Sequence, residues 1–457
     1  MRTCLQLALG LTLFACAAPR PPVAPPNADA VARPVVRPAS AERARKDFDG
    51  AREALLAHDR VRDWNDAACD EIAGRFDALA MPEATFNAGL AVFAAALQGE
   101  AKRRFEKALR DAPQLSHARA ELVLYEFRVT GDLDAAIAAL EATVRDAGFQ
   151  NVAALVNLAA LQMQRSGPLS GDGCTGDVDC AKQNVQRALA IDDAFMPAYN
   201  RLALLYLAQA RRAGTADVQR LELAALVCSQ AIRKNASYAP IHNTAGLVQH
   251  ELGRENGAVA SFGVAAALDP RLFEAQMNYA AANLSFRGFE EAQKGYQKAL
   301  AIRPGDYDAH LGLALALRGR IDHTNHDAQV AAVRAELEAA KRIDVERPDA
   351  FYNEAILVEE YESKGRNKAQ TIAGLSRAQA LLASFIEKAT GKPAYDGAVQ
   401  RAKERIEDME TMKTFIQGAG TFSGAPRPPR PLPSPYGPSP APQPSTPPAT
   451  PLPLPSP

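Results

Sequence analysis

The sequence predicts an all-α fold, a solenoid of stacked helix pairs with Pro-rich segments at both ends. Alanine is abundant, whereas aromatic residues make up only 6% of the 457 residues, which favours long helices over an aromatic-rich β domain. A pattern of small and bulky residues also recurs every 34 residues. Finally, half of the 32 prolines lie in residues 418–457, a segment that cannot join a packed helical core.

The repeat is clearest around the bulky residues Cys228, Phe262 and Tyr296, which are 34 residues apart. Each of them has an alanine four residues before it and another three residues after it: Ala224 and Ala231, Ala258 and Ala265, Ala292 and Ala299. Small residues let two helices approach closely, and the bulky residue fills the gap toward the next pair. Pro270 and Pro304 stop the second helices. The period therefore predicts a helix-turn-helix unit.

The same frame extends in both directions along the chain. Phe105, Leu140 and Val185 hold the bulky position, but their spacing exceeds 34, which predicts enlarged turns at residues 166–179 and 210–221. A further insertion is expected at residues 321–328. We predict about eight repeats in residues 82–391, an N-terminal helix pair in residues 47–81 and a charged capping helix in residues 392–417.

Small residues at repeat positions 8, 20 and 27, a bulky one at 24 and proline at 32 resemble the tetratricopeptide repeat. Residues 243–247, with Gly246 at position 8, carry its first-helix signature. The resemblance implies a right-handed superhelix whose concave face, lined by the first helices, binds extended peptides or helices of other proteins.

The N-terminus predicts export. Arg2 precedes an apolar stretch at residues 5–15 that is too short to span a bilayer. Residues 13–16 resemble the bacterial lipobox, which implies that residues 1–15 are removed and Cys16 is acylated; the alternative is an ordinary signal peptide with an incidental cysteine. Ala17, where an Asp would mark inner-membrane retention, favours the periplasmic face of the outer membrane.

Both Pro-rich ends are predicted to be extended. Residues 16–46 are interpreted as a semi-rigid tether between the lipid and the helical body. Residues 418–457 would reach on the order of 100 Å as polyproline II. The sequence leaves three roles open for this tail. It docks in an aromatic groove of a partner protein, extends toward the cell wall, or serves only as a spacer.

The sequence offers little enzymatic chemistry. The formal net charge of -1 includes no basic excess that would indicate nucleic-acid binding. Phosphate loops, nucleophile elbows and zinc motifs are lacking, so we predict no enzyme activity, cofactor, metal or small-molecule substrate. His242 and His310, two repeat lengths apart, are interpreted as packing residues, and His323 with His326 lack a helical metal-binding face. Residues 171–179 lack the carboxylate pattern of a calcium loop.

Two sets of residues are candidate sites besides Cys16. Cys174 and Cys180, inside the longest enlarged turn, are predicted to form a disulfide, whereas Cys69 and Cys228 are interpreted as free thiols. Four asparagines near position 5 of first helices are predicted to face the peptide groove: Asn200, Asn243, Asn278 and Asn353. Because cations do not recur beside them, general groove contacts are favoured over a carboxylate clamp.

Four strings, at residues 239–244, 283–288, 306–311 and 392–399, look like the tetratricopeptide lipoprotein of the myxobacterial adventurous gliding motility (Glt) machinery. The likeness runs from about Trp64 to Ile416. It implies an outer-membrane-anchored periplasmic scaffold in an envelope-spanning complex, with other envelope proteins as partners. The alternative is an accessory lipoprotein, a pilotin or barrel-assembly partner, for outer-membrane assembly or secretion; a cell-wall-remodelling enzyme is a third possibility.

Overall fold

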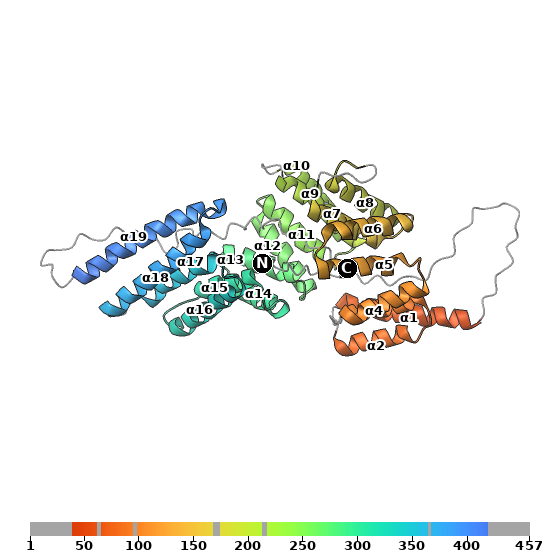
Figure 1. Ribbon diagram of the computed structural model, residues 1–457, viewed down its shortest axis with the longest axis horizontal. Helices are drawn as coiled ribbons and strands as arrows, with labels where there is room; N and C mark the ends of the chain where they lie inside the picture. The colour runs from red at the N-terminus through yellow and green to blue at the C-terminus, as the bar shows by residue number, and fades with distance from the viewer. Residues whose placement is uncertain are drawn as a thin grey trace. The chain divides into compact units, whose positions relative to one another are not determined.

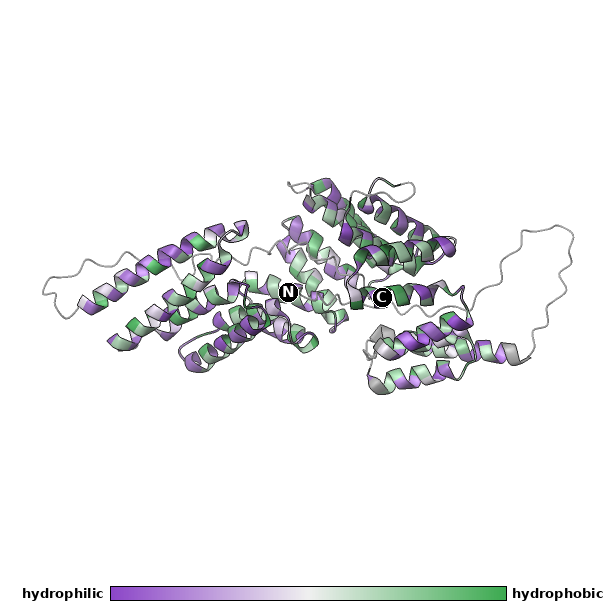
Figure 2. Ribbon diagram, viewed as in Figure 1, coloured by the Kyte–Doolittle hydropathy of each residue, from purple (hydrophilic) through white to green (hydrophobic). Residues whose placement is uncertain are grey.

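The computed structural model describes residues 39–61, 65–94, 98–167, 174–212, 217–363 and 367–418. This part of the chain contains nineteen α-helices and no strand, which confirms the all-α prediction (Figure 1). Cys16, Trp64 and the Pro-rich tail lie outside the described residues. Hydrophobic and hydrophilic residues are mixed along the helices (Figure 2). None of the described helices has the length and apolar character that crossing a bilayer requires.

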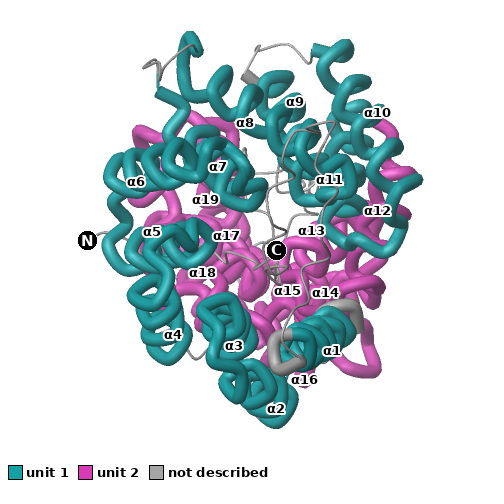
Figure 3. The backbone as a smooth tube through the Cα atoms, turned by 90° about the vertical axis from the view of Figure 1, so that its right-hand side faces the viewer, with its two compact units in different colours: residues 1–252, 447–457 teal, residues 253–446 magenta. Residues whose placement is uncertain are grey.

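The helices divide between two compact units, with the boundary after Leu252 (Figure 3). Unit 1 holds α1 (Ala39–Val61), α2 (Asp66–Asp77), α3 (Pro82–Ala94), α4 (Gln98–Asp111), α5 (Ser116–Thr130), α6 (Leu133–Asp146), α7 (Val152–Arg165), α8 (Asp177–Ile191), α9 (Met196–Arg212), α10 (Val218–Lys234) and α11 (Ala239–Glu251). Unit 2 holds α12 (Glu255–Leu268), α13 (Phe273–Ser285), α14 (Phe289–Ile302), α15 (Tyr307–Arg318), α16 (His326–Ile343), α17 (Asp349–Leu357), α18 (Lys368–Ala389) and α19 (Asp396–Gly418).

Within each unit, successive helices pack as pairs. In unit 1, α3 packs on α4, α5 on α6, α7 on α8 and α9 on α10; in unit 2, α13 packs on α14, α15 on α16 and α17 on α18. First helices also contact the first helices of neighbouring pairs, as α7 contacts α9 and α13 contacts α15. The second helices of neighbouring pairs make no comparable contact in the described chain. The first helices therefore lie on the inner side of each array, as in a tetratricopeptide fold.

The repeat residues explain this packing. All six residues at the bulky position are buried: Phe105, Leu140, Val185, Cys228, Phe262 and Tyr296. The residues that flank them by four and three positions are buried too, and all except Thr143 are alanine. Gly89 in α3 lies against the Phe105 ring, so closely that an added Cβ would come within 2.6 Å of a ring carbon. Small and bulky residues therefore interlock, which sets the distance between the helices.

Two helix pairs of unit 2 are closed by an arginine that the sequence reasoning missed. The guanidinium of Arg303, after α14, lies 3.9 Å from the Phe273 ring centre and donates to Glu274 at 2.8 Å. Arg347, after α16, repeats the arrangement on Tyr307, at 3.8 Å, and on Asp308, at 2.6 Å. In both pairs, the end of the second helix is thus tied to the start of the first.

The boundaries of several elements differ from the sequence expectations. Helix α1 begins at Ala39, inside the range assigned to the tether, because residues 39–46 follow the last proline of that stretch and are rich in good helix formers. Helix α8 begins at Asp177, inside the expected turn, and α16 begins at His326. A π-helical turn, Val358–Glu362, continues α17 and had no counterpart in the repeat frame. The cap begins with a 3₁₀ turn, Pro393–Tyr395, before α19.

The Gly89 contact gives a test of the interlocking. Alanine normally stabilises a helix interior by about 0.5–1 kcal/mol relative to glycine. We expect Gly89→Ala to lower the free energy of unfolding by about 1–3 kcal/mol instead, because the new methyl overlaps Phe105. Gly74→Ala in α2 is the matched control, since nothing lies within 4 Å of its added Cβ, and it should stabilise. Urea unfolding followed by circular dichroism compares them; equal effects of the two substitutions would contradict the interlocking.

Candidate functional site

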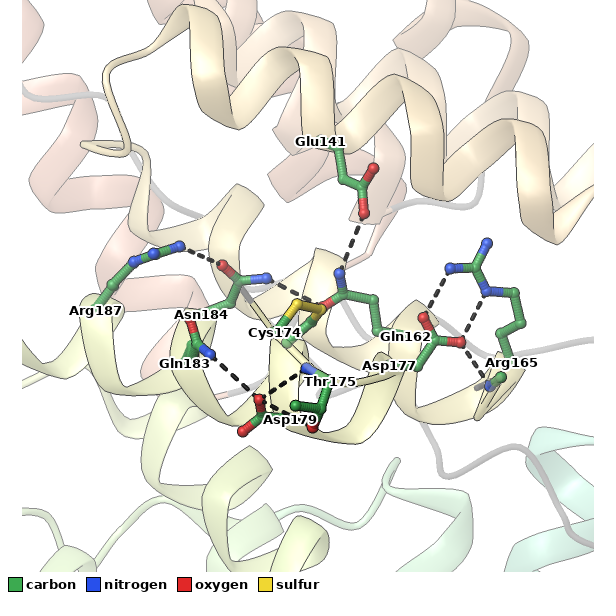
Figure 4. The surroundings of a disulfide bond; sticks show 12 residues. Glu141, Gln162, Arg165, Cys174, Thr175, Asp177, Asp179, Gln183, Asn184 and Arg187 are labelled. Carbon is green, nitrogen blue, oxygen red and sulfur yellow. Dashed lines mark hydrogen bonds and ion pairs between the residues drawn. A yellow bond between two sulfur atoms is a disulfide. The ribbon is translucent and has the colours of Figure 1, made fainter. Parts of the chain in front are cut away.

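The structure joins Cys174 and Cys180 as a disulfide, with their Cα atoms 5.2 Å apart, at the start of α8 (Figure 4). The two cysteines frame the first turn of the helix, and Cys180 is buried. Thr175 donates its backbone N–H to the Asp179 carboxylate at 3.1 Å, and Gln183 donates to the same carboxylate at 3.3 Å. The disulfide therefore closes a small hydrogen-bonded loop at one end of the enlarged turn.

A buried ion pair fixes the base of the same turn. Arg165, at the end of α7, donates from Nε and Nη2 to the two oxygens of Asp177 at 2.8 and 2.7 Å. Gly167 N–H also donates to Asp177 at 2.7 Å, and the Asp177 side chain is only 1% exposed. Burial acts to raise the pKa of Asp177, but these hydrogen bonds hold the pKa below its ordinary value. The carboxylate thus stays ionised and anchors the turn.

Beneath the turn, a row of polar side chains links three helices. Asn184 of α8 donates to Gln162 of α7 at 3.0 Å, and Gln162 in turn donates to Glu141 of α6 at 3.3 Å (Figure 4). Gln162 and Asn184 are buried. These amides satisfy one another inside the stack and are structural. In the described residues, no three His, Cys, Asp or Glu side chains gather as a metal site would require.

The histidines singled out by the repeat frame hold loops in place. His242 Nε2 lies 2.8 Å from the carbonyl oxygen of Ala236, and His310 Nε2 lies 3.0 Å from that of Pro304. Both bonds reach six residues back to the turn before the helix. His310 also contacts Glu336 of α16 at 2.6 Å. The two histidines therefore make equivalent contacts in their repeats.

The four predicted groove asparagines are not equivalent. Asn200 and Asn243 are buried, and Asn200 accepts a hydrogen bond from Thr244 at 2.6 Å, which joins α9 to α11. Asn353 is half-buried and accepts from Arg318 at 3.1 Å, and Asn278 is half-buried as well. Asn200 and Asn243 are therefore less exposed than Asn278 and Asn353, and groove contact stays a prediction for all four. Hydrogen bonding between first helices satisfies the buried amide oxygen of Asn200.

The remaining thiols are packing residues. Cys69 and Cys228 are buried and outside any disulfide. Burial raises the pKa of Cys228 to about 12, so its thiol is unreactive at neutral pH. Cys228 occupies the bulky position of its repeat, which explains why a cysteine stands there.

Helix α5 carries two charges that the sequence reasoning did not single out. Glu121 and Arg128 are half-buried, and their spacing of seven residues places them on the same face of the helix. The Arg128 guanidinium stacks 4.5 Å from the centre of the Phe93 ring of α3, and its Nη1 is buried without a hydrogen-bond acceptor in the described chain. Burial raises the pKa of Glu121 to about 7, against the opposing effect of Arg128. The repeat frame could have revealed this pair, at positions 5 and 12 of a first helix.

The Asp177 anchor gives a test. Asp177→Asn should lower the free energy of unfolding at pH 7 by on the order of 3 kcal/mol, because Arg165 loses its buried carboxylate partner and keeps only the exposed Asp134. Because the folded-state pKa of Asp177 is lowered, the stabilisation is present above the ordinary pKa and disappears as the pH falls through the lowered one. The two proteins should therefore converge in acid, as measured by urea unfolding from pH 7 to pH 2. A constant difference over that range would contradict the ion pair.

The contribution of Glu121 to the free energy of unfolding should have the opposite pH dependence. Its folded-state pKa is raised, so the wild-type protein loses stability as the pH rises toward and through about 7. Glu121→Gln should remove this loss and stabilise the protein by about 1–2 kcal/mol at pH 8, allowing for partial exposure, with little effect at pH 4.5. Glu126→Gln, on the same helix but paired with Lys102 at 2.7 Å, is the matched control and should not stabilise. Thermal unfolding at both pH values measures the effect.

Neither a protein-family model nor a curated protein sequence matches the chain. Among solved structures, it is similar to a thermophilic TPR protein of Thermus thermophilus, with 26% identity over 52% of this chain and 99% of that one and a TM-score of 0.30. It is also similar to pilF of Pseudomonas aeruginosa, with 15% identity, 57% and 96% coverage and a TM-score of 0.40. A third is PilW, a widely conserved type IV pilus biogenesis factor, with 18% identity, 55% and 98% coverage and a TM-score of 0.38.

Because these TM-scores are low, the fold assignment rests on the helix pairs and buried repeat residues described above. By those features the chain is a tetratricopeptide-type repeat protein.

Proposed function

We propose that the protein is an outer-membrane-anchored periplasmic scaffold that binds other envelope proteins within an envelope-spanning gliding motility complex. The observation that carries the scaffold role is the row of first helices, which contact one another along each unit. Such a row offers a continuous surface to which several repeats contribute, and this suits an extended partner better than a small molecule.

The proposed lipid anchor and the proposed gliding motility complex are inferred from the sequence. Cys16 follows a lipobox-like stretch, and several acyl chains on one residue hold a protein firmly at a membrane surface. The strings at residues 239–244, 283–288, 306–311 and 392–399 resemble the gliding-motility lipoprotein. The second candidate, an accessory lipoprotein for outer-membrane assembly or secretion, would use the same anchor and helix array with different partners.

Substitution of the anchor residue gives the decisive test. We expect the wild-type protein to fractionate with the outer membrane and the Cys16→Ala protein to leave it, because acylation is lost. Cys4→Ala, in the same export segment, is the matched control and should leave the location unchanged. Cell fractionation and immunoblotting measure both.

In-cell crosslinking and affinity purification of the same proteins identify the partners. Recovery of motility-complex subunits with the wild-type protein, and their loss with Cys16→Ala, would support the gliding scaffold. Recovery of secretin or barrel-assembly components would contradict the gliding role and support the accessory lipoprotein for outer-membrane assembly or secretion. Recovery of no envelope protein would overturn the scaffold role.

A further inference from the structure

Helix α19 closes unit 2, but its solvent side is not wholly polar. Among the described elements it packs mainly on α18, and Ala402 and Met409 are buried in the cluster that the two helices share. On the solvent side, Phe415 is 60% exposed and Met412 is 39% exposed. The end of a repeat array normally presents polar residues, because no further repeat covers it. These two side chains therefore leave apolar surface that a further segment would cover favourably.

The solvent side of α19 is also acidic. Helical spacing places Glu404, Asp408 and Phe415 in one line, four and seven residues apart. Glu404 and Asp408 are exposed, and neither forms an ion pair within the described chain. Glu410 differs, because it pairs with Lys413 of the same helix at 2.9 Å. A segment that covers this face should therefore carry both apolar groups and positive charge.

The Pro-rich tail that follows α19, outside the described residues, has the complementary composition. Residues 419–457 contain two charged residues, Arg427 and Arg430, and no Asp, Glu or Lys. In polyproline II geometry, residues three apart lie on the same side of the chain, so both guanidinium groups would face one surface. The prolines around them offer apolar rings, which pack well on exposed aromatic side chains.

The connection is long enough for the tail to return along α19. The helix ends at Gly418, and Arg427 follows nine residues later, which allows an extended span of up to about 30 Å. Asp408 and Glu404 lie only about 15 and 21 Å back along the helix axis. Two of the connecting residues are glycine, which eases a reversal of direction. Because a short tether gives an effective concentration in the millimolar range, even a weak contact is populated.

We propose that residues 425–433 of the tail fold back and bind the solvent side of α19. The two tail arginines pair with the carboxylates of Asp408 and Glu404. The prolines beside them cover the exposed side chains of Phe415 and Met412. A second copy of α19 fits this face less well, because its carboxylates would oppose those of the first. The contact goes beyond the proposed scaffold role: it closes one end of unit 2, so that a partner of this face has to displace the tail.

Hydroxyl-radical footprinting of the full-length protein, read by mass spectrometry, measures how exposed individual side chains are in solution. We expect Phe415 and Met412 to react about twofold or more faster in the double variant Arg427→Gln/Arg430→Gln than in the wild type, because the tail no longer covers them. Phe286, which is 53% exposed at the end of α13, is the internal reference and should react equally in both proteins. The two substitutions lie outside the helical body, so they leave its packing unchanged.

The other Pro-rich segment supplies a matched control. The double variant Arg33→Gln/Arg37→Gln removes two arginines that also precede prolines, and it should leave the protection of Phe415 unchanged. Salt at 1 M should remove the protection in the wild type, because the screening length falls to about 3 Å and exposed ion pairs weaken.

A charge exchange tests the pairing itself. Arg427→Glu/Arg430→Glu in the tail and Glu404→Arg/Asp408→Arg in α19 should each abolish the protection, and the combination should restore it. The inference is overturned if Phe415 reacts equally fast in the wild type and in the tail variants. It is also overturned if the protection increases with protein concentration, because the contact would then come from the tail of a second copy.

Discussion

The close approach of paired helices is the constraint on which the rest of the structure depends. Alanine or glycine at each crossing lets the backbones come together, and one bulky side chain per repeat fills the space that remains, as Phe105 does against Gly89. Because each helix pair buries its apolar surface mainly against its neighbours, the interlocking has to recur in every repeat. The row of first helices, and with it any surface for a partner, follows from this repetition.

Polar contacts then close and orient the pairs. Arg303 and Arg347 each bind an aromatic ring and a neighbouring carboxylate at the start of their repeat, and the Ala350 N–H donates to the Tyr307 hydroxyl at 3.0 Å, which links one repeat to the next. The buried Glu354 is held by Lys341 and Arg377. Burial strengthens such contacts and makes their loss costly, so they favour one arrangement of the helices.

The fold could be predicted because a 34-residue period leaves the positions of small and bulky residues visible in the sequence. The arginine contacts could not, because Arg347 and Asp308 are 39 residues apart and nothing local marks them as partners. Asn200 was predicted to contact the peptide groove because it lies at position 5 of a first helix. Whether its amide faces solvent or a neighbouring helix depends on tertiary packing, which the repeat period does not reveal. The repeat frame places Glu121 and Arg128 at positions 5 and 12 of a first helix, but their burial could be recognised only once the neighbouring helices were placed.

The turn between α7 and α8 is held at its base by Asp177 and Arg165, and the Cys174–Cys180 bond closes the segment of the turn that leads into α8. Its chain can therefore change in length without altering the helices, because the entropy of loop closure grows only slowly with length. The turn is consequently a place where evolution can add a recognition element, or where an experimenter can insert a fluorescent domain, while the solenoid on either side keeps its register.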